Sequence, residues 1–402
     1  MLKPLRLSPS FGFGDRLGLA TPAHIQALHA CRSHLLPVFA QQSVRENART
    51  GRTPQQVLDD ARRAVEAAGW DQPWGADADH LKTLDDLAPF VSAGYTFYTV
   101  DSIAQINPLA DRLPVDILRE QVTAVEWERL ISLYLSRQDE PPWGRFEPEG
   151  LLRAQVKYGG LIHHAAIMFR RLSQLLDDFD FEVSVDESET PVSPVEHFFI
   201  ASELIQAGVR FTSLALRFPG RFEKGVDYLG DLAALDAEMT KHAAVTAHFG
   251  SYKISLHSGS DKFSVYPLLV RHWGTRIHIK TAGGSYLEAL RTLAAAAPPL
   301  FERIWQLALE RYPEERQTYH VSADANRIAK NLPLPALLDD FHARQILHVT
   351  YGSALAVYGE EIKSALIRHH DQYVENLVRY LRRHLELLEE NPSAPRFEQP
   401  SG

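Results

Sequence analysis

The stretch YKISLHSGSDK, residues 252–262, ends an apolar, strand-like run with a histidine and several polar side chains. Successive side chains of a strand point to opposite faces, so Lys253, Ser255 and His257 are expected to share one face. The same alternation occurs in FDFEVSVDE, residues 179–187, where acidic and hydroxyl side chains occupy every second position. Unpaired charge is costly inside a protein, so strands of this kind point to a binding site rather than a plain core.

Strand-like runs of this type alternate along the chain with segments that carry helix-start signals. Examples are the pair Thr53-Pro54 and the capping box that begins at Ser193. Strands that alternate with helices favour a parallel sheet, and eight units within roughly 290 residues fit a (β/α)8 barrel, whose active sites lie at the carboxyl ends of the strands. A doubly wound sheet is the alternative, but GFGDRLG lacks the GxGxxG spacing of its usual cofactor fingerprint. The eight runs are residues 10–15, 36–43, 74–80, 95–102, 179–187, 210–218, 252–257 and 276–280.

The predicted organisation is one barrel with added helical segments. The length of 402 residues and the hydrophobic content of 45% are sufficient for a core of this size. Residues 1–300 are expected to form the barrel, with a helical insertion at about 105–177 after the fourth strand. Residues 301–390 should form a mainly helical extension that packs on the barrel, and residues 391–402 a disordered tail.

Composition narrows the classes of partner. A net charge of −9 argues against nucleic acid as the main partner, although a small anion needs only a local cluster of basic groups. The single cysteine, Cys31, suits a reducing compartment, and no apolar run approaches the length of a membrane span. We therefore expect a soluble, cytoplasmic protein with no membrane partner, and the sequence is compatible with a homo-oligomer.

The predicted strand ends combine carboxylates with histidines, which is typical of a divalent metal site. Imidazole and carboxylate ligands suit zinc, manganese, iron or nickel. A lone histidine of this kind is as often a hydrogen-bonded structural residue, but three at the strand ends of one barrel favour a metal. The side chains concerned are Asp77, Asp79, His80, Glu182, Asp186, Glu187, His257 and His278.

Basic side chains near other strand ends could hold an anionic group of a substrate. The cations that offer charge for a carboxylate or phosphate are Arg217 with Arg221 and Lys224, Arg45 and Lys280. Arginine can bind such a group through a bidentate fork. The stretch TAGGSYLE places Gly283 and Ser285 at a predicted helix start, where backbone N–H groups favour an anion. A tight turn with an N-cap explains that stretch equally well.

Long, distinctive stretches occur along most of the chain. They read GFGDRLGLATPAH, FAQQSVRENARTGRT, WGADADH, DFEVSVDESETPVSP, LALRFPGRFEKGVDYLGDL, YKISLHSGSDKFSVYP, HIKTAGGSYLEAL, YHVSADAN and HVTYGSAL. Together they resemble the tagaturonate/fructuronate epimerase family of hexuronate catabolism, from about residue 10 to residue 355. The resemblance implies a metal-dependent sugar-acid epimerase, with a divalent cation as cofactor and a small sugar acid as substrate.

The resemblance also carries roles onto individual positions. Its motifs mark Asp79, His80, Glu182 and His257 as acid–base or metal groups, and Asp227 as a further candidate ligand. Combined with the strand-end analysis, the predicted site comprises Asp79 and Glu182 as catalytic carboxylates, His80, His257, His278 and Asp227 as metal ligands, and Asp15, Arg16, Gln42, Arg45, Arg217, Lys280 and Ser285 as substrate-binding residues.

The implied reaction restricts the chemistry. The two ketohexuronates differ at a hydroxyl-bearing carbon that is β to the ketone, so simple enolisation cannot invert it. Hydride transfer would need a nicotinamide, for which the sequence has no fingerprint. Retro-aldol cleavage followed by re-addition can invert this carbon, and it needs a base for the hydroxyl, a metal at the carbonyl and a cationic clamp for the carboxylate.

Other functions remain open from the residues alone. A metal-dependent aldolase or an aldose–ketose isomerase could use the same groups on a similar barrel. A glycoside hydrolase would need two carboxylates and no metal. A non-catalytic sugar-acid binding protein would show no turnover with any metal.

Overall fold

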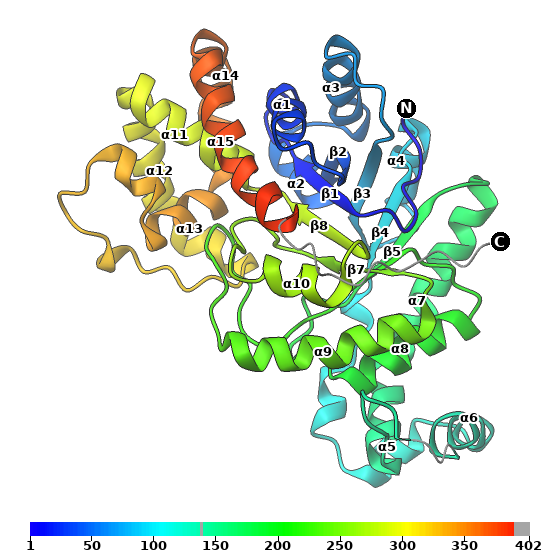
Figure 1. Ribbon diagram of the computed structural model, residues 1–402. Helices are drawn as coiled ribbons and strands as arrows, with labels where there is room; N and C mark the ends of the chain where they lie inside the picture. The colour runs from blue at the N-terminus through cyan, green and yellow to red at the C-terminus, as the bar shows by residue number, and fades with distance from the viewer. Residues whose placement is uncertain (137–139, 390–402) are drawn as a thin grey trace.

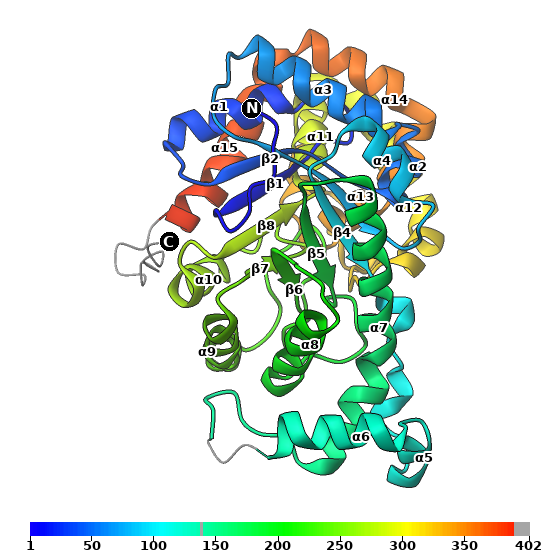
Figure 2. The same ribbon diagram turned by 90° about the vertical axis from the view of Figure 1, so that its right-hand side faces the viewer.

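Eight parallel strands close into a barrel in chain order (Figures 1 and 2). The computed structural model describes residues 1–136 and 140–389, so the predicted tail at 391–402 lies outside the described residues. A strand forms within or across each of the eight predicted runs, which confirms the (β/α)8 barrel. The strands are β1 (Ser10–Gly14), β2 (Leu36–Ser43), β3 (Gly75–Leu81), β4 (Phe97–Asp101), β5 (Asp180–Ser184), β6 (Ser213–Ala215), β7 (Lys253–Leu256) and β8 (Ile277–Thr281).

The two faces of the strands differ as the alternation predicts. On β5, Phe181 and Val183 are buried in the main hydrophobic cluster, whereas Glu182 is buried among polar side chains. The Glu182 carboxylate accepts hydrogen bonds from Ser213 Oγ on β6, at 2.6 Å, and from Thr99 Oγ1 on β4, at 3.3 Å. The interior of this barrel is therefore a hydrogen-bonded polar layer, where many barrels hold branched apolar side chains.

Outer helices cover the strands, and several begin with the caps that the sequence indicates. Both side chains of a capping box are hydrogen-bonded at Thr53 with Gln56 and at Ser193 with Glu196, so two orphan N–H groups are satisfied at each helix start. The helices along the first seven strands include α1 (Thr21–Cys31), α3 (Pro54–Ala67), α4 (Leu87–Ala93), α7 (Pro148–Leu175), α8 (Pro194–Gln206), α9 (Leu232–Phe249) and α10 (Tyr266–Trp273).

A helical insertion separates β4 from α7. It contains short helices that extend away from the barrel, below α8 and α9 in Figures 1 and 2. The long helix α7 returns the chain to β5 and packs against α8. The inserted helices are η1 (Ile103–Gln105), η2 (Pro108–Asp111), α5 (Val115–Glu120), α6 (Ala124–Leu130) and η3 (Ile131–Leu135).

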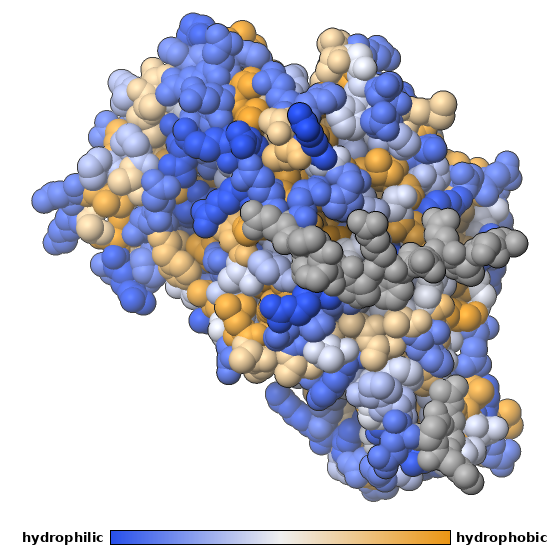
Figure 3. All heavy atoms as spheres, viewed as in Figure 1, coloured by the Kyte–Doolittle hydropathy of each residue, from blue (hydrophilic) through white to orange (hydrophobic). Residues whose placement is uncertain are grey.

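The helices after β8 pack on the barrel, and the last of them, α15, belongs to its outer layer. α15 packs against α1, α10 and α11, and the His384 ring lies edge-on to Phe11 of β1, with 6.4 Å between the ring centroids. Hydrophilic residues predominate over the outside of α14 and α15 in Figure 3. The helices after β8 are α11 (Gly284–Ala296), α12 (Pro298–Glu315), α13 (Phe341–Val349), α14 (Tyr351–Arg368) and α15 (His370–Glu389). The short helix α2 (Val44–Thr50) lies earlier, between β2 and α3.

Between α12 and α13 the chain runs through the 3-10 turns η4 (Arg316–Thr318), η5 (Ala325–Arg327) and η6 (Leu334–Leu338). Tyr319, which follows η4, accepts a hydrogen bond from Arg49 Nη1 of α2 at 2.6 Å. This contact brings the segment to the same end of the barrel as the carboxyl end of β2. Among the described helices, none is both long and apolar enough to cross a membrane.

Leu381→Ala tests the contribution of α15 to the barrel. Leu381 is 1% exposed, so the truncation should lower the free energy of unfolding by about 2–5 kcal/mol through lost burial and a residual cavity. Ile367→Ala on α14, at a side chain that is 63% exposed, is the matched control and should have little effect. Thermal and urea unfolding measure both; equal effects would mean that α15 adds little to stability.

Candidate active site

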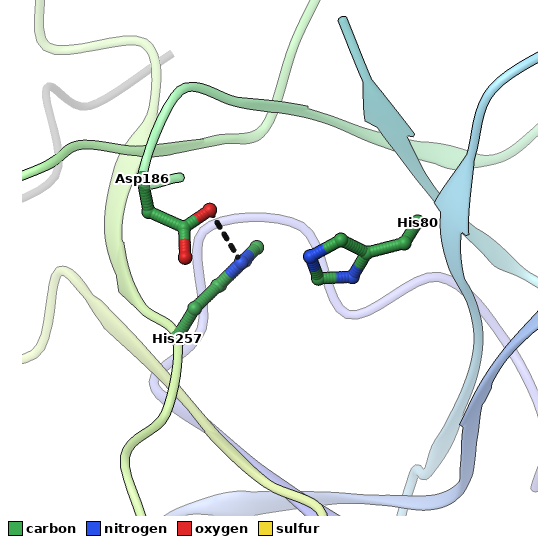
Figure 4. A group of neighbouring side chains, drawn as sticks. All are labelled: His80, Asp186 and His257. Carbon is green, nitrogen blue, oxygen red and sulfur yellow. Dashed lines mark ion pairs between the residues drawn. The ribbon is translucent and has the colours of Figure 1, made fainter. Parts of the chain in front are cut away.

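A polar cavity opens at the carboxyl ends of the strands, and we call it the inner cavity. A second, outer cavity adjoins it and shares six lining residues with it. Figure 4 shows three side chains of the inner cavity, which reach it from β3 and from the segments that follow β5 and β7. The shared residues are Asp186, Glu187, Lys224, His257, Ser258 and Tyr319.

The floor of the inner cavity is an ion cluster around Lys280. Its ammonium lies 2.7 Å from Asp77 Oδ2, 2.8 Å from Asp79 Oδ1 and 2.9 Å from Glu182 Oε1. All four side chains are buried, with Asp77 and Glu182 fully enclosed. One ammonium against three carboxylates gives the cluster an excess of negative charge, which favours a further cation beside it.

Burial and charge act in opposite directions on the pKa values of this cluster. Burial raises the pKa of Asp77 to about 7, since the nearby Lys280 ammonium only partly offsets it. Burial alone would lower the pKa of Lys280, but the surrounding carboxylates outweigh burial and raise it well above its usual value. Burial opposes ionisation of Asp79 as well, but His80 and Lys280 hold its pKa well below the ordinary range. Asp79 and Lys280 are therefore charged near neutral pH.

His257 joins this floor to the wall of the cavity. Its Nε2 lies 2.7 Å from Glu182 Oε1, and its Nδ1 lies 3.0 Å from Asp186 Oδ1. Burial would lower the pKa of His257, but the Asp186 and Glu182 carboxylates outweigh it and raise the pKa to about 10. The two carboxylates thus create a position where positive charge is strongly favoured.

His80, Asp186 and His257 form a group suited to a divalent cation. One ligand atom from each lies within 4.8 Å of the others, and the His80 ring faces the Asp186–His257 ion pair from the opposite side (Figure 4). The Nδ1 atoms of both histidines are buried and lack a well-aligned hydrogen-bond partner. Two imidazoles and a carboxylate are a ligand set that zinc and other first-row metals accept. The residues therefore fit the predicted metal.

His80 reaches this position through a strained backbone. It has a φ of +56°, in the left-handed region, and the register between β3 and β4 shifts between Ala78 and Leu81. A non-glycine residue in this conformation costs free energy and is frequent at functional sites. The irregularity lets Asp79 and His80, which are neighbours in sequence, both face the inner cavity.

Most of the charged residues predicted for the site lie at this end of the barrel. Asp79, His80, His257, Lys280, Arg16 and Arg45 line the inner cavity. Glu182 lies below it and touches His257 and Lys280. Arg217 lines only the outer cavity, where its Nη1 donates to the Ser188 carbonyl at 2.5 Å.

Two predicted metal ligands do not join the group. His278 faces the interior two residues before Lys280, and its Nδ1 is hydrogen-bonded to Ser10 Oγ at 2.9 Å, away from His80 and His257. Asp227 accepts hydrogen bonds from Ser264 N and Oγ just before α10, so its carboxylate supports a loop. Strand alternation gives the face on which a side chain lies but not its depth in the barrel.

Three predicted substrate-binding residues have structural partners. Asp15 accepts from the backbone N–H groups of Leu17, Gly18 and Ala20, and Ser285 is hydrogen-bonded to His24 of α1. Gln42 is hydrogen-bonded to Thr50 and Arg52.

The neighbour of Gln42, Gln41, lines the inner cavity instead. Its side chain fits there because Gly12 has no Cβ; an added Cβ would lie 1.9 Å from Gln41 Oε1.

Several lining residues are absent from the predicted set. Asp186 is one of the strand-end carboxylates that suggest a metal, but it is not among the four predicted ligands, although it completes the group with His80 and His257. Tyr319 and His348 come from the segments after β8, and no local pattern places those segments over the barrel. Lys224, which the sequence offers beside Arg217 as a cation for an anionic group, is not among the residues finally assigned to the substrate, yet it lines both cavities.

Comparison with known proteins gives a consistent result. The family model described as tagaturonate epimerase, UxaE, matches residues 2–388. The tagaturonate/fructuronate epimerase of Thermotoga maritima is 43% identical over 399 residues, which cover 96% of this chain and 82% of that protein. A glycerol-complexed crystal structure of fructuronate-tagaturonate epimerase UxaE from Cohnella laeviribosi has a TM-score of 0.92 at 35% identity, with 97% of this chain and 83% of that chain covered. These matches confirm the resemblance that the sequence motifs indicate.

Metal binding should depend on the observed group rather than on all the predicted ligands. His257→Ala and Asp186→Ala should weaken metal binding by more than about 100-fold, since even the loss of a group that only supports a ligand costs up to that factor. His278→Gln and Asp227→Asn should keep the metal, because neither side chain faces the group.

Elemental analysis after chelation and reloading with zinc or manganese measures this difference. Full metal in His257→Ala, or loss of metal in Asp227→Asn, would contradict the assignment.

Proposed function

We propose that this chain, which belongs to the tagaturonate epimerase family, inverts one carbon of a keto sugar acid and so interconverts tagaturonate and fructuronate. The proposal rests on the arrangement of side chains at the mouth of the barrel. There the group His80, Asp186 and His257 lies beside the ionised carboxylate of Asp79. The proposed role is in hexuronate catabolism, as the family resemblance implies.

The proposed path is retro-aldol cleavage followed by re-addition. A base removes the proton from the hydroxyl on the carbon β to the ketone. The bond between the α and β carbons then breaks, its electron pair stays with the ketone-bearing fragment, and the β carbon becomes an aldehyde. The aldehyde turns its other face, the same bond re-forms, and the proton returns to the new alkoxide. Atoms and electrons balance without any external oxidant or reductant.

Asp79 is the proposed base. It lines the inner cavity, and its Oδ1 is held by Lys280 and by His80, each 2.8 Å away. This fixed carboxylate can accept the hydroxyl proton and return it after the aldehyde has turned. A carboxylate with a low pKa is a weak base. The site must therefore also make the substrate hydroxyl more acidic for Asp79 to remove its proton.

His80, Asp186 and His257 would hold the divalent cation, whether zinc, manganese, iron or nickel. When bound, such a cation polarises the ketone carbonyl and stabilises the negative charge that develops during cleavage. Glu182 is the second proposed catalytic carboxylate. It lies below the cavity and touches His257 and Lys280, so it acts by keeping those two side chains in position.

A metal-dependent aldolase on the same barrel is the alternative that product analysis separates. An epimerase converts one hexuronate into another of equal mass, whereas an aldolase releases two fragments. Proton NMR of the purified protein with tagaturonate, with and without added divalent metals, distinguishes the two. Accumulation of fragments without any epimer would overturn the proposal.

The retro-aldol path makes an isotopic prediction. Only a carbon–carbon bond breaks at the inverted carbon, so the hydrogen on that carbon stays attached during turnover. In deuterated water, NMR and mass spectrometry should find no deuterium there, and added nicotinamide cofactor should not change the rate. Deuterium at the inverted carbon would favour direct deprotonation instead.

Asp79→Asn should separate catalysis from metal binding. Loss of the base should lower kcat by about 10²–10⁴-fold, the usual contribution of acid–base catalysis, while the metal is still bound at saturating metal concentration. Steady-state kinetics and elemental analysis on the same preparation measure both quantities. Wild-type kcat in Asp79→Asn would remove Asp79 from the proposed mechanism.

A further inference from the structure

The basic side chains that line the inner cavity differ in whether their charge is already paired. Arg16 forms an ion pair with Glu46 at 2.8 Å and lies over the Tyr351 ring. Lys280 is surrounded by its three carboxylates, as described above. The charges of both cations are therefore already paired with carboxylates of the protein.

Two lining cations have no ion pair among the described residues. Arg45 lies over the Tyr319 ring, 5.0 Å from its centroid. Lys224 is the other. It lines the inner and the outer cavity, and its Nζ donates to Ser258 Oγ at 2.5 Å. Across residues 1–136 and 140–389, no carboxylate oxygen lies within the 4.0 Å ion-pair distance of this ammonium. A half-buried ammonium in a cavity, without a paired anion, is suited to binding an anionic ligand.

The backbone on both sides holds this ammonium close to the metal group. Ser258 directly follows His257 and has a φ of +50°, a strained conformation for a serine. Gly225, which follows Lys224, has a φ of +72° in the region that glycine adopts freely. Because Lys224 is hydrogen-bonded to Ser258, its ammonium is held beside the residue that follows His257, a proposed metal ligand.

The distribution of charge in the inner cavity decides which end of a sugar acid can lie beside Lys224. Asp79 and Glu182, around Lys280, make the floor of the cavity negative and would repel a carboxylate. Asp186 and Glu187 line the same cavities as Lys224, but both lie beyond ion-pair distance of its ammonium. If the ketone lies at His80 and His257, the carboxylate lies two carbons beyond the carbon that is inverted. Lys224 offers that end an unpaired positive charge.

We propose that Lys224 binds the substrate carboxylate and so makes the site select sugar acids over neutral sugars; this rests on the proposed function. In the cleaved state the carboxylate belongs to the aldehyde fragment. The same ammonium therefore keeps that fragment in the cavity while its aldehyde turns. Arg217, in the outer cavity with one Nη atom bound to Ser188, is not needed for this role.

The test compares two ligands that differ only at the group in question. Calorimetry on the metal-loaded protein gives the Kd for tagaturonate and for tagatose, which carries a hydroxymethyl group in place of the carboxylate. In Lys224→Gln the Kd for tagaturonate should rise about 10- to 100-fold, the factor expected from losing a hydrogen bond to a charged group. The Kd for tagatose should not change, and released cleavage fragments should increase during turnover of tagaturonate.

Two further variants and a measurement of bound metal serve as controls. Lys224→Arg keeps the charge and should retain the preference for the acid, even if Lys224→Gln folds poorly. Lys241→Gln removes the same group from an exposed position on α9 and should behave as wild type. Equal weakening of both ligands, or no weakening of tagaturonate, would overturn the role of Lys224. A wild-type protein that binds tagaturonate through Lys224 but does not epimerise it would overturn the proposed function alone.

Discussion

The barrel is organised around one buried interaction, the contact of the Lys280 ammonium with Asp77, Asp79 and Glu182. These side chains come from β8, β3 and β5, so the cluster ties together strands that are not neighbours in the barrel. Buried ion clusters repay their desolvation only when every member is paired, and removing one member costs about 3–5 kcal/mol. A hydrophobic interior of equal volume would be at least as stable, so the cluster is better explained by chemistry than by stability.

The same carboxylates also shape the functional end of the barrel. Asp79 holds His80, and Glu182 holds His257, so the side chains that would bind a cation are fixed by the groups that neutralise Lys280. Strain concentrates at this end as well. Within residues 1–136 and 140–389, five non-glycine residues have a positive φ, and three of them, His80, Ser258 and Asp261, lie on β3 or in the loop that follows β7. Packing elsewhere must compensate for that cost, and the helices after β8 contribute to this compensation.

The sequence predicts the barrel well because its signals are local and repeated eight times. Strand alternation correctly directs Asp79, Glu182, His257 and Lys280 inward. It fails where the contact that decides a side chain's role involves residues far apart in sequence, or depends on how deep the side chain lies in the barrel. His278 shares a face with Lys280 but lies deeper, against Ser10. The carboxylate of Asp227 is used by Ser264. Tyr319 and His348 reach the cavity from segments whose position depends on tertiary packing alone.

The position of α15 has a consequence for how the protein is made. Arg344 of α13 forms an ion pair with Asp261, and His384 of α15 accepts a hydrogen bond from the Asp261 backbone N–H at 3.1 Å. Asp261 follows His257 by four residues, so the loop that begins with a proposed ligand receives its last supports from late parts of the chain. During synthesis on the ribosome, β1 and α1 emerge first and wait for the helix that covers them. Nascent chains stalled before residue 370 would therefore expose Phe11 and its surroundings to chaperones, and their active-site loop would lack the support of His384.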